Sequence, residues 1–253
     1  MRTHAPQGSH LRGRETHDAL ERHERTPILG ARPAVERARP SAVDATGGRV
    51  KVLAIGSEKG GCGKSTTTLY LAARAAERLH SSAAHPKVAI VDRDRDGHLS
   101  RMWVRRADVR RASIVLQQGT SLPEADSGIE LVLIDTPPGA DALATLREAH
   151  LVVVPCPPTE WNVESLNIYL QRVSDVIRTR RLDMRLVAIL PTIVKRTNLH
   201  RVNLEKMQAL ASMQDPPLLV LPPIPDHSEV QEPNLSTHEY DAAAEELFRY
   251  AAL

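Results

Sequence analysis

The sequence predicts an α/β fold in which helices cover both faces of a doubly wound, mostly parallel sheet. Short apolar runs alternate along the chain with longer segments of helical spacing, which is typical of right-handed strand–helix–strand units. The runs are continuously apolar, as expected for strands that are buried on both faces. Because aromatic residues make up only 3% of the chain, the core must consist of Val, Ile, Leu and Ala.

The elements follow one another from residue 50 onward. The first apolar run, 50–57, predicts a buried strand, and the helical spacing of the next segment predicts a helix over 64–80. Further strands are expected at 87–92, 129–139, 150–156, 184–192 and 218–225. Further helices are expected at about 159–181, 198–213 and 241–250. Sheets of this kind bind ligands at the carboxyl ends of their strands, and the motifs below all lie at such ends.

Two parts of the chain differ in composition. Residues 1–49 hold nine arginines against six acidic residues, lack aromatic residues and show no sustained period, so we expect a mobile, Arg-rich tail. Residues 50–253 are expected to form one folded domain. This domain is close to neutral, so any contact with nucleic acid there must come from a local basic patch.

Cysteine usage and hydropathy narrow the class of protein. Two cysteines that are far apart in sequence give neither a disulfide framework nor a paired metal or redox motif. The N-terminus has no apolar signal segment, and the apolar run at 151–158 is too short to span a bilayer. We therefore expect a soluble, cytoplasmic protein without membrane attachment.

The stretch SEKGGCGKST, residues 57–66, indicates a phosphate-binding loop between the first strand and the first helix. Glycines let the backbone wrap around a phosphate, and successive N–H groups form a nest for it. Lys64 would reach the β- and γ-phosphates, Ser65 would ligate Mg²⁺, and Thr66 would touch the α-phosphate. The residues expected to bind the nucleotide here are Gly60, Gly61, Cys62, Gly63, Lys64, Ser65 and Thr66.

This loop departs from the ordinary pattern at two positions. Glu58 stands where the ordinary pattern has its first glycine, and an additional lysine, Lys59, precedes the paired glycines. The residues alone leave two interpretations: a damaged site, or a site whose second lysine serves a second purpose.

Carboxylates follow two of the other predicted strands. Asp135 ends the run VLID, the usual position of a carboxylate that holds Mg²⁺ through water. Asp92 and Asp94 end the second strand, and alternate residues of an extended segment point to the same side. Ser65, Asp92 and Asp135 are therefore the candidate metal-binding residues.

Together, EKGGCGKST, VDRDRD, VLIDTPPG and VVVPCPP resemble the ParA/MinD group of deviant Walker ATPases, and above all the small plasmid-type ParA partition proteins. The match in order and spacing covers roughly residues 50–235 and implies a P-loop NTPase-like fold. Members of this group commonly read D-x-D-P-Q, whereas Arg95 and Asp96 stand here in place of Pro and Gln. The departure leaves Asp94 in place and changes the loop that follows it.

The resemblance implies roles for individual residues. Lys59 would mark a nucleotide-sandwich homodimer and would enter the ATP site of the partner copy. Asp94 would position or activate the attacking water, with Asp92 close to the metal. Hydrolysis of ATP would be slow and stimulated by a partner protein. The adenine base would lie near the segments that begin at Thr192 and follow Pro225.

The resemblance also implies binding of the ATP dimer to non-specific DNA, and hence a nucleoid-associated protein. Lys195, Arg196 and Arg201 are the candidate DNA contacts, because they follow the fifth predicted strand. Asp226 and Glu229 stand where related chromosomal proteins carry arginines. The implied partner is a ParB-like centromere-binding protein, and the implied process is partition of plasmids or chromosomes.

Two alternative functions remain open from the sequence. A positioning ATPase for another cargo, such as a protein compartment, would share the whole mechanism. A P-loop biosynthetic ligase of the same superfamily would form a product and would not need DNA. A MinD-type regulator is disfavoured, because the C-terminal segment EELFRYAAL is short, acidic and weakly amphipathic.

Overall fold

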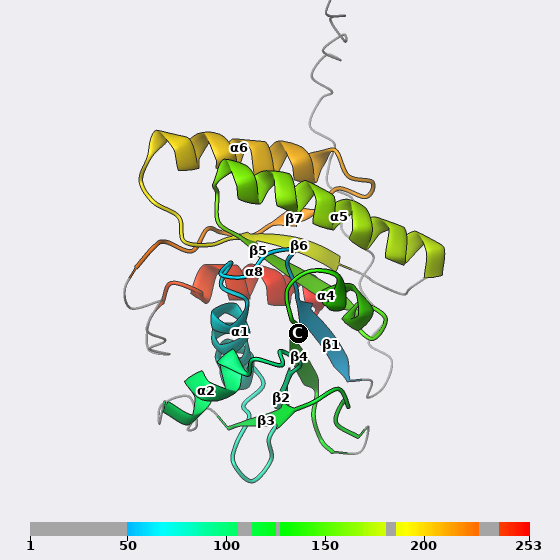
Figure 1. The fold of residues 1–253 in the computed structure, drawn as a ribbon. Helices are drawn as coiled ribbons and strands as arrows, with labels where there is room; N and C mark the ends of the chain where they lie inside the picture. The colour runs from blue at the N-terminus through cyan, green and yellow to red at the C-terminus, as the bar shows by residue number, and fades with distance from the viewer. Residues whose placement is uncertain (1–49, 106–112, 125–126, 181–185, 228–237) are drawn as a thin grey trace, which may run out of the picture. The chain divides into compact units, whose positions relative to one another are not determined.

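The computed structural model describes residues 50–105, 113–124, 127–180, 186–227 and 238–253. The predicted tail, 1–49, lies outside them. In the described residues, seven strands form one sheet in the order β3-β2-β4-β1-β5-β6-β7, and every neighbouring pair is parallel (Figure 1). The strands are β1 Lys51–Ile55, β2 Val88–Asp92, β3 Ile114–Gln118, β4 Leu131–Asp135, β5 Leu151–Cys156, β6 Leu186–Pro191 and β7 Leu219–Val220. The predicted fold class is confirmed.

The helices that the sequence predicts are also present. They are α1 Lys64–Arg78, α5 Glu160–Arg180, α6 Asn198–Ser212 and α8 Asp241–Ala251. Three short elements were not predicted: α2 His98–Arg105, β3 and α4 Ala140–Thr145. The strand expected at 218–225 shrinks to the two residues of β7, because Pro222 and Pro223 cannot donate to a strand ladder.

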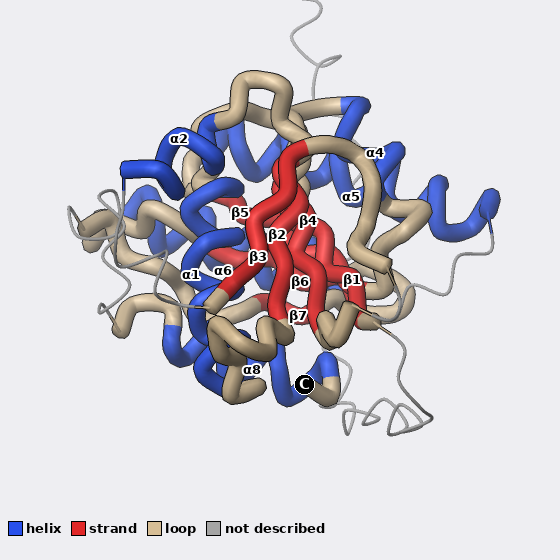
Figure 2. Tube along the Cα trace, turned by 90° about the horizontal axis from the view of Figure 1, so that it is seen from below, coloured by secondary structure: helices blue, strands red, loops and turns tan. Residues whose placement is uncertain are grey.

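Alternate residues of the central strands face opposite sides of the sheet and belong to separate cores. Leu53 and Ile55 of β1 belong to the core that α1 and α8 cover, whereas Ala54 belongs to the core beneath α5 and α6. Val152 and Val153 of β5 divide in the same way. Figure 2 shows the strands at the centre with helices around them. Both faces of the sheet are therefore covered, as the continuously apolar runs predict.

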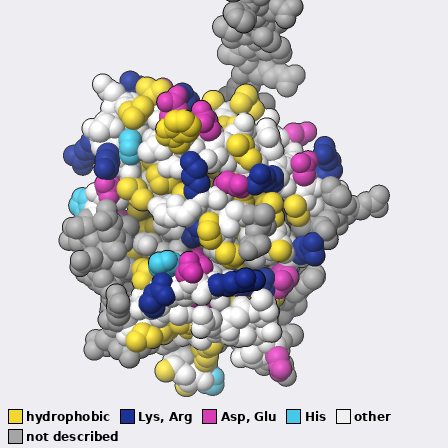
Figure 3. Space-filling view, viewed as in Figure 1, with side chains coloured by type: hydrophobic (Ala, Val, Ile, Leu, Met, Phe, Trp, Pro, Cys, Tyr) yellow, Lys and Arg dark blue, Asp and Glu magenta, His cyan; other side chains and the backbone are white. Residues whose placement is uncertain are grey.

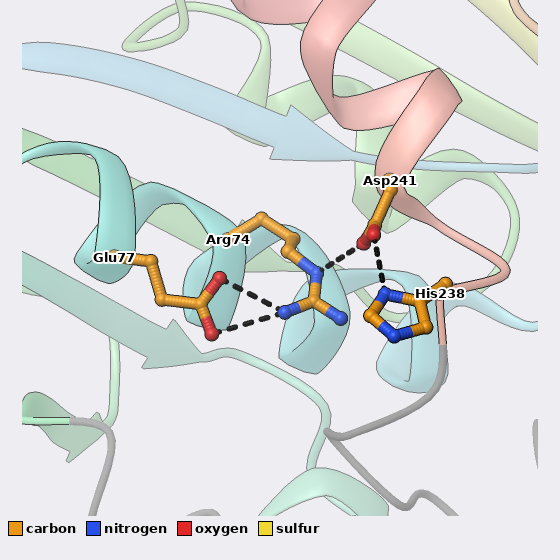
Figure 4. A network of polar contacts seen from close by, with 4 residues as sticks. All are labelled: Arg74, Glu77, His238 and Asp241. Carbon is orange, nitrogen blue, oxygen red and sulfur yellow. Dashed lines mark hydrogen bonds and ion pairs between the residues drawn. The ribbon is translucent and has the colours of Figure 1, made fainter.

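A network of ionic contacts joins α1 to the beginning of α8 (Figure 4). The Arg74 guanidinium contacts both oxygens of Glu77 within α1, and its Nε lies 2.6 Å from Asp241 Oδ1. His238 Nδ1 lies 2.8 Å from the other oxygen of Asp241. Asp241 is the first residue of α8, where a negative charge also stabilises the helix N-terminus. The last helix is thus tied to the helix that follows the predicted phosphate loop.

The strand register brings the predicted motifs to one row. Asp135 at the end of β4 lies beside Ile55 at the end of β1, and beside Asp92 at the end of β2. The phosphate loop follows Ile55 directly. The parallel sheet therefore places the loop and both carboxylates at one edge, as the sequence predicts. None of the described helices is long and apolar enough to cross a membrane.

Candidate nucleotide-binding site

The loop between β1 and α1 has the backbone of a phosphate nest. Gly61 and Gly63 have φ of 74° and 86°, a conformation that a residue with a Cβ adopts only with strain. A Cβ added at Gly60 or Gly61 would meet no atom within 4 Å, so this side of the loop is open. Helix α1 begins at Lys64, directly after the left-handed Gly63, and directs its first N–H groups toward the opening. The arrangement fits a bound phosphate group.

The Lys64 side chain is folded under the loop that precedes it. Its ammonium donates to the carbonyl of Lys59 at 3.2 Å and lies 3.5 Å from Ser57 Oγ. Burial lowers the pKa of Lys64, whereas the negative charge of Asp135 opposes that shift. The buried ammonium is therefore held beside the loop where phosphate oxygens would lie.

Asp135 is the most deeply buried carboxyl group of the site. Ser65 Oγ donates to its Oδ2 at 2.6 Å and Thr68 Oγ1 donates to its Oδ1 at 3.3 Å. Burial raises the pKa of Asp135 to about 7, the nearby Asp92 adds to the shift, and the Ser65 hydrogen bond opposes it. A buried carboxylate next to a hydroxyl and a second carboxylate fits the oxygen donors that Mg²⁺ prefers. Thr68, one turn beyond the motif, was not predicted.

Asp92 holds the loop that follows β2. Its Oδ2 accepts from both the N–H and the hydroxyl of Ser100, at 3.0 and 2.6 Å, and its Oδ1 accepts from the N–H of Asp94 at 3.1 Å. The side chain is 1% exposed. These hydrogen bonds hold the loop between β2 and α2 in place. The contact of Asp92 with a metal stays a prediction.

Asp94 lies on the wall of a cavity of about 440 Å³ at the phosphate loop, and its predicted role toward the attacking water stays a prediction. The cavity has the size of a small-molecule site. It is lined by Gly60, Gly61, Gly63, Lys64, Ser65, Thr66, Asp94, Asp96, His98, Met102, Pro138, Thr192, Ile193, Ile224 and Tyr240. His98, Met102 and Tyr240 come from segments without a recognisable motif, so no sequence signal points to them.

The side chains of Lys59 and Cys62 do not line the nucleotide cavity. Lys59 is exposed, is absent from the cavity wall, and its ammonium contacts the carbonyl of Trp161 at 3.3 Å. The Cys62 side chain is buried, and its carbonyl accepts a hydrogen bond from Thr192 Oγ1 at 3.0 Å. The two lysines of the loop therefore occupy different environments.

The segments expected near the adenine base meet beside the cavity. A bridge pairs Val194 with Pro225, and the N–H of Val194 donates to the carbonyl of Ile224 at 3.0 Å. Thr192 and Ile224 line the cavity, whereas Pro225 does not. The predicted role of Thr192 and Pro225 in holding the base stays a prediction.

The predicted DNA contacts are partly neutralised. Lys195 Nζ lies 3.4 Å from Asp226, and Arg201 pairs with Glu205 at 2.8 Å. Arg196 is exposed. On the face that Figure 3 shows, basic and acidic side chains are interspersed. The predicted patch therefore carries less positive charge than its sequence implies.

The middle of α5 packs along the beginning of the phosphate loop. Tyr169 is fully buried, and its hydroxyl oxygen would lie 2.3 Å from a Cβ at Gly56. Arg172 donates to Glu58 Oε1 at 2.6 Å. Glu58, the departure from the ordinary pattern, is thus an ion-pair partner of α5. Nothing in the sequence pattern pairs these residues, because they are more than 100 positions apart.

A parallel α/β sheet with a glycine loop, a buried lysine and a carboxylate row defines a P-loop nucleotide-binding protein. Residues 53–238 match the family of the CobQ/CobB/MinD/ParA nucleotide binding domain, and the chain belongs to this family. It is a ParA/MinD-type deviant Walker ATPase, as the resemblance implies.

One named relative matches part of the chain. The chain is 34% identical over 124 residues to the Maintenance of carboxysome distribution protein A of Gloeobacter kilaueensis, an alignment that covers 46% of this chain and 53% of that protein. The chain thus spans about half the length of this relative.

Three solved structures share the fold. An ATP complex of McdA from Cyanothece has a TM-score of 0.64 at 15% identity, covering 82% of this chain and 98% of that one. A Borrelia burgdorferi plasmid partition protein bound to AMPPNP has a TM-score of 0.58 at 17% identity, covering 81% and 98%. Cobyrinic acid a,c-diamide synthase from Mycobacterium smegmatis, with an ATP analogue and magnesium, has a TM-score of 0.60 at 21% identity, covering 80% and 96%.

Proposed function

We propose that this chain is a positioning ATPase that forms a homodimer when it binds ATP and moves a cargo other than a plasmid. The observation that carries the ATP-dependent homodimer of this proposal is the different placement of the two loop lysines. Lys64 is buried beside the loop of its own chain, whereas Lys59 is exposed and contacts a backbone carbonyl. An exposed cation beside a phosphate loop is available to a second copy of the chain.

Each part of the site has a task in this mechanism. When bound, Mg²⁺–ATP supplies the phosphoryl group that water attacks. The N–H groups around Gly61 and Gly63 hold the phosphates, and the Lys64 ammonium neutralises part of their charge. Lys59 adds a second positive charge from the partner copy. Ser65 and Asp135 are the residues that would hold the magnesium ion.

Asp94 orients the water molecule. Its side chain lies on the cavity wall, and its Oδ1 is fixed by the N–H of Asp96 at 3.0 Å. The Asp94 carboxylate accepts a hydrogen bond from the water molecule and so directs the water oxygen toward the phosphate. Because the Asp92–Ser100 hydrogen bonds fix the base of this loop, Asp94 stays near the phosphate loop.

The relatives support the choice of cargo. A protein named for carboxysome distribution is 34% identical over the aligned part, and McdA has the same fold. We therefore propose a protein compartment or assembly as cargo, with non-specific DNA as the surface on which the ATP dimer assembles. Arg196, Lys195 and Arg201 are the proposed DNA contacts. Asp226 and Glu205 next to them would make this binding weak and dependent on salt.

DNA binding by the purified protein with ATP, ADP and no nucleotide, at low and moderate salt, tests the proposal. Binding that requires ATP and weakens with salt supports it, and ATP hydrolysis is measured in the same samples. An Arg196→Ala variant should lose part of the DNA affinity but keep its ATP turnover. DNA indifference in every nucleotide state would contradict the proposal and favour a small-molecule ligase.

Plasmid or chromosome partition is the second candidate. The Borrelia plasmid partition protein has the same fold, and the loop sequence EKGGCGKST resembles that of plasmid-type ParA proteins. A ParB-like centromere-binding protein that stimulates hydrolysis would establish this function. Stimulation by a cargo-bound protein without affinity for a DNA site would instead support the positioning function.

A further inference from the structure

Trp161 is an unusual side chain for the surface of this protein. It is 74% exposed, and it lies in the first turn of α5. Apolar residues on the inner side of α5, including Leu166, Leu170 and Val173, pack into the core. Ile168, seven residues after Trp161 and so on the same side of the helix, is also exposed at 46%. The outer side of α5 therefore presents an aromatic residue to solvent.

Trp161 lies beside Lys59, the lysine that enters the nucleotide site of the partner copy in the proposed mechanism. The Lys59 ammonium is 3.3 Å from the Trp161 carbonyl. In the described part of the chain, no carboxylate pairs with this ammonium. A second copy that approaches closely enough to receive Lys59 must also approach the first turn of α5. The exposed indole then lies within the contact area.

The beginning of α6 extends the same surface. Figure 1 shows α5 and α6 side by side, with their N-terminal ends toward the same side of the molecule. Asn203 donates to the carbonyl of Pro158 at 3.1 Å, and Lys206 lies 3.9 Å from Glu160. Leu199 and Val202, in the first turns of α6, are 59% and 39% exposed. Exposed apolar side chains thus occur in the first turns of both helices, whose N-terminal parts are in contact.

We propose that Trp161 is the apolar anchor of the ATP-dependent interface between two copies of this chain. This inference rests on the proposed function, because it takes the direction of approach from Lys59. Tryptophan is enriched among the interface residues that dominate binding energy, and charged residues typically surround such an anchor. Glu160, Lys206 and Lys59 occupy that rim here. A second copy fits this surface because, in that position, Lys59 of the first copy would lie next to the nucleotide of the second.

The test compares Trp161→Ala with Met213→Ala. Met213 is 73% exposed at the other end of α6, so it controls for the loss of an exposed apolar side chain. Both substitutions leave the Trp161 carbonyl contact with Lys59 intact. Sedimentation velocity with a non-hydrolysable ATP analogue gives the dimer dissociation constant. Trp161→Ala should raise it about 30-fold or more, while Met213→Ala should leave it within about 3-fold of wild type.

Binding of a fluorescent ATP analogue to the monomer, at low protein concentration, should be the same in all three proteins, since Trp161 does not line the nucleotide cavity. Tryptophan fluorescence gives a second readout. Addition of the ATP analogue should shift the emission to shorter wavelength and reduce quenching by acrylamide, and Trp161→Phe should remove this change. The half-buried Trp103 follows Met102, which lines the nucleotide cavity, so the signal of the Trp161→Phe protein gives the contribution of Trp103 to be subtracted.

The outcomes separate the inference from the proposed function. A wild-type dimer that depends on ATP and on Lys59, but is unaffected by Trp161→Ala, overturns the inference alone. A wild-type protein that stays monomeric with every nucleotide overturns both. A Trp161→Ala protein that fails to bind the fluorescent ATP analogue would show that the residue acts on the nucleotide site, which also contradicts the inference.

Discussion

Gly56 and Tyr169 give the sharpest test of how α5 is packed against the phosphate loop. Gly56 follows β1 and donates to the carbonyl of Val153 at 3.1 Å, and its φ is not in the left-handed region. An alanine is therefore compatible with the backbone. Its Cβ would lie 2.3 Å from Tyr169 Oη and 3.4 Å from Cζ. Because a carbon–oxygen contact needs about 3.3 Å, the tyrosine or the loop must move by roughly 1 Å.

The cost of that movement follows from the burial of Tyr169. Its ring is fully buried in the core beneath α5, so it cannot swing into solvent. Overpacking of this kind costs about 1–3 kcal/mol of the free energy of unfolding. The Tyr169 hydroxyl has no hydrogen-bond partner among the described residues, so Tyr169→Phe should cost little on its own. In the Gly56→Ala/Tyr169→Phe protein, the clashing oxygen is absent and most of the lost stability should return.

Urea denaturation of the wild type, the two single variants and the double variant measures this coupling. Equal slopes of the four transitions would show that the midpoints report stability. Gly60→Ala is the matched control, since a Cβ there meets no atom within 4 Å and stability should stay within about 0.5 kcal/mol of wild type. A double variant as unstable as Gly56→Ala alone would refute the steric explanation.

The remaining predictions concern the nucleotide and the carboxylates. Lys64→Ala should lower ATP affinity by at least about 100-fold, because it removes a buried cation from the loop; unchanged affinity in calorimetry would contradict the assignment. Asp94→Ala should bind ATP normally but hydrolyse it about 100-fold more slowly, and normal turnover in a phosphate-release assay would exclude its role. Asp135→Asn should stabilise the metal-free protein above neutral pH. Burial raises the pKa of Asp135 from 3.8 to about 7 in the fold, so the wild type loses stability as the pH rises through this range, by on the order of 4 kcal/mol. Thermal unfolding in EDTA at several pH values measures this difference, and parallel curves for the two proteins would contradict it.

The long elements could be predicted from sequence because their signals are local. The runs of β1, β2, β4, β5 and β6 are continuously apolar, and helices such as α1 repeat their apolar residues with helical spacing. The phosphate loop could be placed for the same reason: its glycines and lysines are adjacent in sequence. The left-handed φ values of Gly61 and Gly63 are what a short turn between a strand and a helix requires.

The parts that could not be predicted depend on distant neighbours. β3 reads IVLQQ, an edge strand whose apolar content is too low to stand out. The hydrogen bonds of Asp92 to Ser100 became visible only with the position of α2, an eight-residue helix. The pairing of Lys195 with Asp226 likewise depends on two loops that meet across the sheet edge. A sequence pattern shows charges, but their partners are set by the fold.

The wall of the nucleotide cavity has a consequence for the order in which the site is completed during synthesis. Tyr240 lines the cavity, stacks on Tyr70 with ring centroids 4.5 Å apart, and bonds to Thr67, which lies 173 positions earlier in the chain. A nascent chain of which only the first strands have left the ribosome contains the phosphate loop but lacks the part of the cavity wall that Tyr240 forms. The segment that begins α8 must therefore be synthesised before the cavity can be complete. The Arg74–Asp241 ion pair then holds that segment against α1. A complete nucleotide cavity therefore requires α8 to have packed against α1, so nucleotide binding depends on contacts between segments that are 173 positions apart in the chain.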